Sequence, residues 1–399
     1  MLTRPLLGER VSALSFDAQA GVLRFLTAPR WEWGLTLRTL AIGDLYVPGP
    51  HGPSVTKAAF SPDGRTLATV TVKGTKVTFR TRETGSAKSP PHQLPELPCG
   101  TPTPPQLLPC TGLLAFSADG KTLAYAVMAE LGRKGNRFRL GFWDVDRPRL
   151  IERRELPVGT KAGVSAMTFT PDGAALVLTE FPRIGNTWIW NRRRRALERS
   201  LPGVDGSAVA VFPDGDRLLT GQGHVRSYPS GRADSPTAGP GALQALLFSP
   251  DGSYFAGGTA NGQIHLWDGR IRRRLGILAP SATEPPPEPS PAYALAFSAD
   301  SRLLAAADLD GVLQIWDTST RRPLGIPLPT PGGGIEALAF SADGRALYAA
   351  GLTSGLQTYD VGIGHAVATV CGRIGQGLSR GEWAERLPGV PYRESCPEH

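Results

Sequence analysis

One short phrase recurs along the chain and constrains its fold more than any other feature. The phrase has the form Ala-Phe-Ser-Pro-Asp-Gly, as at Ala59–Gly64, and it returns at steps of roughly 40 to 55 residues, a period typical of repeat architectures. Seven copies place an aspartate in the same turn: Asp63, Asp119, Asp172, Asp214, Asp251, Asp300 and Asp343. An eighth, degraded copy lies upstream at Ala13–Asp17 and lacks the Pro-Asp-Gly turn. The chain is therefore expected to fold as a series of similar units.

Each unit predicts the same run of short strands. The first strand ends at the Phe, and the Ser-Pro-Asp-Gly segment then forms a tight turn, because Pro fixes one dihedral angle and Gly accepts a positive φ. A second strand follows, as at Leu303–Ala307, and turns such as Asn261-Gly262 and Asp310-Gly311 indicate hairpins. A third strand ends in an aromatic–polar pair: Trp143-Asp144, Trp190-Asn191, Trp267-Asp268, Trp316-Asp317 or Tyr359-Asp360. With an edge strand after this pair, each unit has four strands, and the fold class is all-β.

These residues resemble a WD40-repeat β-propeller over nearly all of residues 11–371. Eight units favour eight four-stranded blades, and seven is the alternative because the first unit is degenerate and the fifth is short. We expect one propeller domain over 1–371. The Gly-His pair that the family often places before the first strand is missing from nearly every unit. The resemblance therefore implies only a partial hydrogen-bond network of His, Ser/Thr, Asp and Trp.

Composition supports this fold and locates its irregular parts. The 48 Gly and 37 Pro residues argue against long helices, and 41% hydrophobic residues argue against a wholly disordered chain. Pro-rich insertions at 86–110 and 279–291 are expected to be extended or disordered loops. Either residues 4–8 or residues 365–370 are expected to supply the edge strand that completes the last blade.

The segment 372–399 is predicted to be a tail with a short helix. Ser379 and Glu382 have the spacing of a capping box, so a helix should begin there and end near Leu387. The order of Cys371, Trp383, Tyr392 and Cys396 is similar to a tail that closes many bacterial WD40 arrays. Such arrays are often fused to signalling domains. Cys371 and Cys396 either form a disulfide or only lie near each other.

The sequence contains no pattern typical of catalysis, cofactor binding or metal binding. The six histidines are scattered singly, and the phosphate-binding and nucleophile-elbow motifs are absent. The recurrent aspartates occupy equivalent turns and are interpreted as turn-forming residues. His265, beside Trp267, is interpreted as a packed or rim residue. We therefore expect a protein that is not an enzyme and that needs no cofactor or metal.

Basic residues follow the third strands, and the net charge is +8. In a propeller blade, the turn after the third strand shares one rim with the Asp-containing turn. These residues are Arg80, Arg82, Arg147, Arg149, Arg192, Arg193, Arg194, Arg195, Arg270, Arg272, Arg273, Arg274, Arg321 and Arg322. The runs lack interleaved aromatic residues, which argues against nucleic acid. A solvated rim, a surface for an acidic protein and a surface for anionic lipid stay open. The candidate partner-binding residues of this rim are Arg192, Arg193, Arg194 and Arg195.

Turns between the second and third strands lie on the opposite rim. Their candidate binding residues are Trp31, Trp33, Arg133, Lys134, Arg183, Asp308 and Asp310. Tryptophan is enriched at binding hot spots, although Trp31 and Trp33 are equally consistent with packing into the first unit.

The function predicted from these features is a non-catalytic scaffold for protein–protein contacts, in bacterial signalling or regulation. We expect a cytoplasmic monomer with a protein partner, because no apolar run is long enough to span a membrane and no signal peptide is visible. The alternatives are a regulatory propeller that senses a ligand in its central channel and a propeller enzyme with a site built from rim loops.

Overall fold

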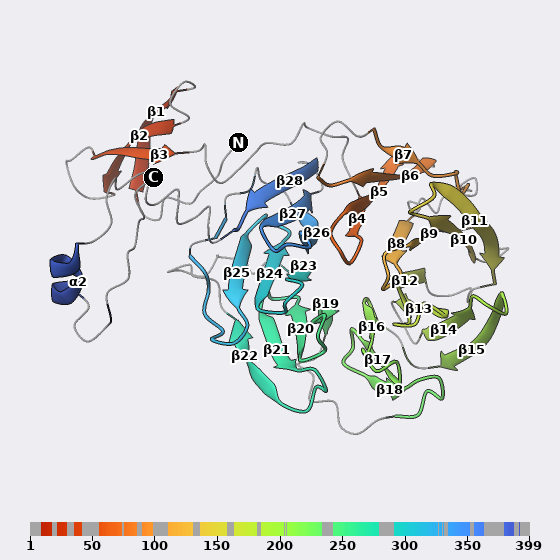
Figure 1. Ribbon diagram of the computed structural model, residues 1–399. Coiled ribbons are helices and arrows are strands. Elements are labelled where there is room, and N and C mark those ends of the chain that lie inside the picture. Colours follow the sequence, from red (N-terminus) through yellow and green to blue (C-terminus); the bar gives the residue numbers. More distant parts are fainter. Residues whose placement is uncertain are drawn as a thin grey trace.

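The protein is described by a computed structural model, in which a ring of small sheets surrounds a central axis (Figure 1). The residues that the structure describes are 9–17, 22–29, 36–41, 56–73, 76–85, 90–98, 111–130, 136–157, 163–181, 185–202, 204, 206–233, 242–278, 291–325, 327–328, 330, 334–351, 355–362, 379–386 and 391.

Seven antiparallel sheets form the ring, and we number them as blades in chain order. Blade 1 contains β4 (Lys57–Phe60), β5 (Thr66–Lys73), β6 (Lys76–Glu83) and β7 (His92–Gln93). Blade 2 contains β8 (Thr111–Phe116), β9 (Thr122–Glu130), β10 (Asn136–Asp144) and β11 (Arg149–Leu156). Blade 3 contains β12 (Gly163–Phe169), β13 (Ala175–Phe181), β14 (Asn186–Asn191) and β15 (Ala196–Pro202).

The remaining blades repeat this order of strands. Blade 4 contains β16 (Val209–Val211), β17 (Arg217–Thr220) and β18 (Val225–Ser227). Blade 5 contains β19 (Leu243–Phe248), β20 (Tyr254–Thr259), β21 (Ile264–Asp268) and β22 (Arg274–Leu278). Blade 6 contains β23 (Ala292–Phe297), β24 (Leu303–Asp308) and β25 (Leu313–Asp317), and single bridges at Pro323 and Leu328 continue its outer edge. Blade 7 contains β26 (Ile335–Phe340), β27 (Ala346–Gly351) and β28 (Gly355–Asp360).

The repeated Ser-Pro-Asp-Gly phrase forms the turn between the first two strands of a blade. In blade 1, Ser61 Oγ donates to Asp63 Oδ1 (2.6 Å) and accepts from the Thr66 amide (2.9 Å). The glycine that follows has φ +69°, which residues with a side chain rarely adopt. The same Ser/Thr–Asp bond recurs in blades 2, 3, 5, 6 and 7. The phrase is thus a local folding unit that reverses the chain within a few residues.

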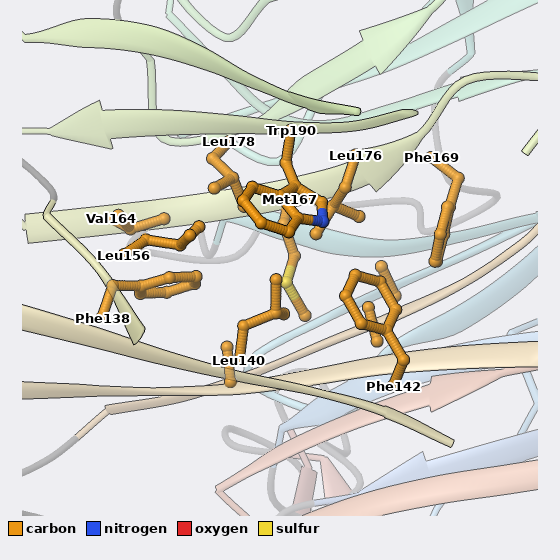
Figure 2. Close-up of a cluster of buried hydrophobic side chains, with 13 residues drawn as sticks. Phe138, Leu140, Phe142, Leu156, Val164, Met167, Phe169, Leu176, Leu178 and Trp190 are labelled. Carbon is orange, nitrogen blue, oxygen red and sulfur yellow. The ribbon is translucent and has the colours of Figure 1, made fainter. Parts of the chain in front are cut away.

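Apolar side chains between neighbouring sheets hold the ring together. Seven buried clusters correspond to the seven contacts between adjacent blades. The largest lies between blades 2 and 3, where Phe138, Leu140 and Phe142 face Met167 and Trp190 (Figure 2). Stability therefore depends on sheet-to-sheet packing, as expected of a repeat protein.

Blades 7 and 1 close the ring directly on each other. Leu67 of blade 1 packs with Ala337, Ala350 and Leu356 of blade 7. The rings of Phe60 and Tyr348 stack at 6.3 Å, and Lys57 Nζ lies 3.1 Å from Glu336 Oε2. Because these two faces meet, no further sheet fits between them.

The favoured prediction of eight blades is therefore wrong, and the alternative of seven is confirmed. The degraded upstream copy forms β1 (Glu9–Asp17), β2 (Val22–Pro29) and β3 (Thr36–Ala41), a separate three-stranded sheet outside the ring (Figure 1). This copy lacks both the Ser-Pro-Asp-Gly turn and the closing Trp-Asp pair, which build the blades of the ring.

The predicted partial network around the tryptophans is observed. Trp190 Nε1 and Trp267 Nε1 are buried and have no hydrogen-bond partner among the described residues. The polar residue after each tryptophan instead caps the next turn. Asn191 Oδ1 accepts the Arg194 amide (2.9 Å), and the Asp268 carboxylate accepts the amides of the basic turn that follows it.

The predicted helix is present as α2 (Arg380–Arg386), with the capping box in place. The Ser379 amide donates to Glu382 Oε2 (2.9 Å), and the Glu382 amide donates to Ser379 Oγ (3.3 Å). Part of the first Pro-rich insertion is also ordered, since β7 pairs with β6, and Leu94 and Leu97 are buried between blades 1 and 2.

Several predictions concern positions outside the described residues. They are the edge strand from 4–8 or 365–370, the second Pro-rich insertion apart from residue 291, the Cys371–Cys396 pair, the Trp383 side chain, Leu387 and Tyr392.

Candidate functional site

The Asp-containing turns and the basic turns lie on one face of the ring, which we call the turn face. In all seven blades, a backbone hydrogen bond joins the turn after the third strand to the Asp-containing turn, as from Gly269 N to Ser253 O (2.7 Å) in blade 5 and from Thr318 N to Arg302 O (2.9 Å) in blade 6. The predicted placement of both turns on one rim is correct. Arg80 and Arg82 are an exception, because they lie within β6 and are half-buried rather than in a turn.

The aspartates of this face are turn-forming, as predicted. A hydrogen bond from the Ser or Thr two residues earlier lowers the pKa of Asp119, Asp172, Asp300 and Asp343. Burial alone would raise the pKa of Asp251, but hydrogen bonds from Ser249, Ser253 and Ser301 outweigh it and lower this pKa to about 2. These carboxylates are ionised at neutral pH and are fully engaged in holding the turns.

The four consecutive arginines of blade 3 are largely committed to other groups. Arg192 is half-buried, and its guanidinium bonds to Gly173 O (2.9 Å) and Thr122 Oγ1 (3.3 Å) while lying over two phenylalanine rings. Burial lowers the pKa of Arg192. Arg194 pairs with Glu198 (2.9 Å) and Arg195 with Glu152 of blade 2 (3.4 Å). Arg193 is exposed and has no ion-pair partner among the residues that the structure describes.

The basic turns of blades 5 and 6 differ, because most of their guanidinium groups have no partner among the described carboxylates. Their exposed arginines are Arg270, Arg272, Arg273, Arg302 and Arg322, which we call the arginine patch. No described carboxylate oxygen lies within 4.0 Å of any of these guanidinium groups. All of these residues except Arg302 were expected in basic turns, but the basic-turn residues predicted to bind a partner were the arginines of blade 3.

The opposite face contains Asp308 and Asp310, in the turn between β24 and β25. Asp308 Oδ1 accepts the amides of Asp310 (3.0 Å) and Val312 (2.8 Å), so it also caps a turn. Burial raises the pKa of Asp308, although these hydrogen bonds oppose the shift. Asp310 is exposed. The other candidates for this face lie outside the described residues: Trp31, Trp33, Arg133, Lys134 and Arg183.

The first strands of all seven blades line a central channel with a cavity of about 360 Å³. Most of the residues that line it are apolar, and the polar ones are Lys57, Ser165, Ser207, Gln244 and Glu336. These polar residues were not predicted from the sequence. In blades 3, 5 and 7 the polar residue stands four positions before the Phe, at a β-bulge, which is the signal that marks the position.

The described residues contain no group of three or more His, Cys, Asp or Glu side chains arranged to hold a metal ion. His265 packs on Trp267, with ring centroids 5.5 Å apart, and its Nε2 lies 3.1 Å from Gln263 Oε1. Burial lowers the pKa of His265, so the imidazole is neutral at pH 7. Its predicted role as a packed residue is confirmed.

Nowhere in the described part of the chain is a helix long and apolar enough to cross a membrane.

Seven sheets of three or four strands around a central channel define the architecture of a β-propeller. Two stretches, residues 237–268 and 287–317, match the family WD domain, G-beta repeat, and they cover the inner three strands of blades 5 and 6. The protein is a WD40-repeat β-propeller. No curated protein matches the chain.

Proposed function

We propose that this propeller is a non-catalytic scaffold that holds protein partners on its exposed turns. The observation that best supports this is the way the ionisable groups of the turn face are used. Its aspartates hold turns, as Asp251 and Asp268 do, and the exposed charges without a described carboxylate partner are the arginines of blades 5 and 6. General acid–base or nucleophilic chemistry needs two such groups within hydrogen-bond reach at a shared cavity. Exposed cations of a single sign suit recognition better.

The form of the ring also supports a scaffold. Apolar clusters join each blade to the next, so the turns are held at fixed positions on two faces. A rigid surface loses little conformational entropy on binding, which favours affinity. Two faces can accept different partners at the same time. The resemblance of the tail to bacterial WD40 arrays supports a role in bacterial signalling, and we propose a monomer that acts in the cytoplasm.

Sequential capture tests the scaffold function. The tagged full chain is purified from the source cells, and the proteins that co-purify in near-stoichiometric amounts are identified. One of them is then immunodepleted from lysates with and without the chain. A scaffold predicts that a second partner is removed together with the first only when the chain is present. If no protein co-purifies, or if the two partners are removed together without the chain, the scaffold function is wrong.

The central channel supports a second candidate function, the sensing of a small ligand. A cavity of about 360 Å³ lies at the lower end of the range for small-molecule sites, and its wall combines apolar residues with a few polar groups. Lys57 and Glu336 place opposite charges at this wall. At least one compound from a panel of metabolites should then raise the thermal midpoint of the wild type but not that of the Glu336→Gln variant. A panel without any stabilising compound would count against sensing.

A further inference from the structure

The arginine patch is one continuous surface built from four turns. In blade 5, Gly269 N donates to Ser253 O (2.7 Å), which joins the basic turn to the Asp251 turn. In blade 6, Thr318 Oγ1 donates to Ser301 O (2.9 Å). The two blades are connected because the Asp251 amide donates to Ser301 Oγ (3.3 Å). Arginines far apart in the sequence are therefore presented on one surface.

The backbone that carries these arginines is held firmly. The Asp268 carboxylate accepts the amides of Arg270 (3.1 Å), Arg272 (2.9 Å) and Arg273 (2.9 Å). Between them, Ile271 is buried in the apolar cluster of blades 4 and 5 and has φ +57°. The turn is thus fixed by an apolar anchor inside and by a carboxylate at its base. A turn fixed in this way presents its side chains to a partner with little loss of backbone entropy on binding.

Blade 6 extends the same surface. Arg321 Nη1 donates to Leu275 O of blade 5 (3.0 Å), which ties the basic turn of blade 6 to β22. The Asp317 carboxylate holds this second turn through the Thr320 amide (2.7 Å). Two large apolar side chains follow the patch arginines along the chain: Ile277 is 46% exposed and Leu324 is 48% exposed. Exposed apolar side chains are therefore present within a few residues of the patch arginines along the chain.

We propose that the arginine patch binds an acidic protein segment that also carries apolar side chains, an inference that rests on the scaffold function proposed above. Charge complementarity selects an acidic partner, because the patch guanidinium groups have no described carboxylate partner. The aspartates of the turns lie among the patch arginines and would repel the continuous row of phosphates in a nucleic acid. The carboxylates of a peptide are separate from one another, so they can contact the arginines while avoiding the aspartates. The exposed Ile277 and Leu324 offer contacts that a nucleic-acid backbone does not use.

The test measures binding of defined probes to the purified full chain by fluorescence anisotropy at low and physiological salt. The main probe is a labelled peptide of Glu and Asp with a Leu at every third position. The comparison probes are the same peptide with Gln and Asn in place of the acids, a single-stranded oligonucleotide, and vesicles containing phosphatidylserine. The acidic peptide is expected to bind most tightly, with an affinity that falls as salt rises.

Two double variants with the same change in net charge locate the site. Arg272→Glu with Arg273→Glu should weaken peptide binding about tenfold, since each reversal replaces an attraction by a repulsion. The matched control is Arg194→Glu with Arg195→Glu, whose arginines are already paired with Glu198 and Glu152. We expect the control to change binding less than about twofold. Arg272→Gln with Arg273→Gln provides a milder variant if the reversal lowers the thermal midpoint.

Several results would overturn the proposal. They are the absence of peptide binding, equal weakening by the two double variants, and tighter binding of the oligonucleotide or the vesicles. Sequential capture with the Arg272→Glu, Arg273→Glu variant separates this failure from that of the scaffold. If the variant retains both partners, the scaffold stands and the patch assignment is wrong. If the wild type captures no partners while the peptide binds at the patch, the scaffold is wrong and the patch assignment stands.

Discussion

Replacing Gly64 by Ala tests the contact that closes the ring. Gly64 lies in the Ser-Pro-Asp-Gly turn of blade 1 with φ +69°. A Cβ atom at this position would overlap the carbonyl oxygen of Phe340, the last residue of β26 in blade 7, and would approach its carbonyl carbon to 3.2 Å. This crowding exists because blades 1 and 7 are neighbours.

Gly344 is a matched control in the equivalent turn of blade 7. Its φ is also +69°, but a Cβ there would meet no atom within 4 Å. In both variants, the left-handed conformation costs about 1–2 kcal/mol once a side chain is present. Gly64→Ala must also displace backbone at the blade contact, and overpacking of this kind adds about 1–3 kcal/mol. Gly64→Ala should therefore lower the free energy of unfolding by about 1–3 kcal/mol more than Gly344→Ala does.

Urea unfolding followed by tryptophan fluorescence measures this difference. The unfolding midpoint should fall in the order wild type, Gly344→Ala, Gly64→Ala, with an unchanged slope, because the variants change stability rather than the surface exposed. If urea unfolding is irreversible, the thermal midpoints of the three proteins are compared at one scan rate instead. Equal midpoints for the two variants would refute the direct packing of blade 7 on blade 1. A ring with a further sheet between these blades would give that result.

Three further predictions concern polar contacts of the turn face and the channel. Arg192→Ala should destabilise the protein by about 2 kcal/mol, because it removes hydrogen bonds and contacts with two phenylalanine rings. Arg193 is exposed, so Arg193→Ala should change stability by less than about 0.5 kcal/mol. Thermal or urea unfolding of both variants measures the difference. The folded pKa of Asp251 is about 2 against a reference of 3.8, so the contribution of its carboxylate to folding stability is complete above about pH 4 and is lost as the pH falls toward 2. The loss of stability caused by Asp251→Asn, at most about 1 kcal/mol for this exposed group, should therefore be smaller at about pH 3 than at about pH 6 in urea titrations. An equal loss at both pH values would contradict the reasoning. A double-mutant cycle of Lys57→Ala and Glu336→Ala should give a coupling of about 0.5–1 kcal/mol that shrinks in high salt, and zero coupling at low salt would refute the ion pair across the closure.

The local structure of each blade could be predicted from the sequence because its causes are local. The hydrogen bond from Ser61 to Asp63 and the capping box of Ser379 each join residues within five positions of each other. The positive φ of Gly64 is a property of a single residue. Such patterns depend on residue type and spacing alone. The prediction that the recurrent aspartates form turns succeeded for the same reason.

The candidate site was predicted less completely, because the state of a charged side chain depends on its neighbours in space. Arg192–Arg195 form the longest arginine run, and these were the residues of the basic turns predicted to bind a partner. Arg195 finds its partner Glu152 on the adjacent blade, and Arg192 lies over Phe142 of that blade. Arg272 and Arg273 have no described carboxylate nearby. Pairing between blades is invisible without the fold.

The sequence by itself determined the repeating unit of this protein: strand, Ser-Pro-Asp-Gly turn, strand, and a third strand with a closing aromatic–polar pair. The tertiary structure decided how many units enter the ring, because closure depends on whether the faces of blades 1 and 7 fit together across nearly the whole chain. It also decided which arginines are paired, because an acidic partner can come from a neighbouring blade, as Glu152 does for Arg195. Both outcomes follow from contacts between distant residues, which short-range spacing cannot specify.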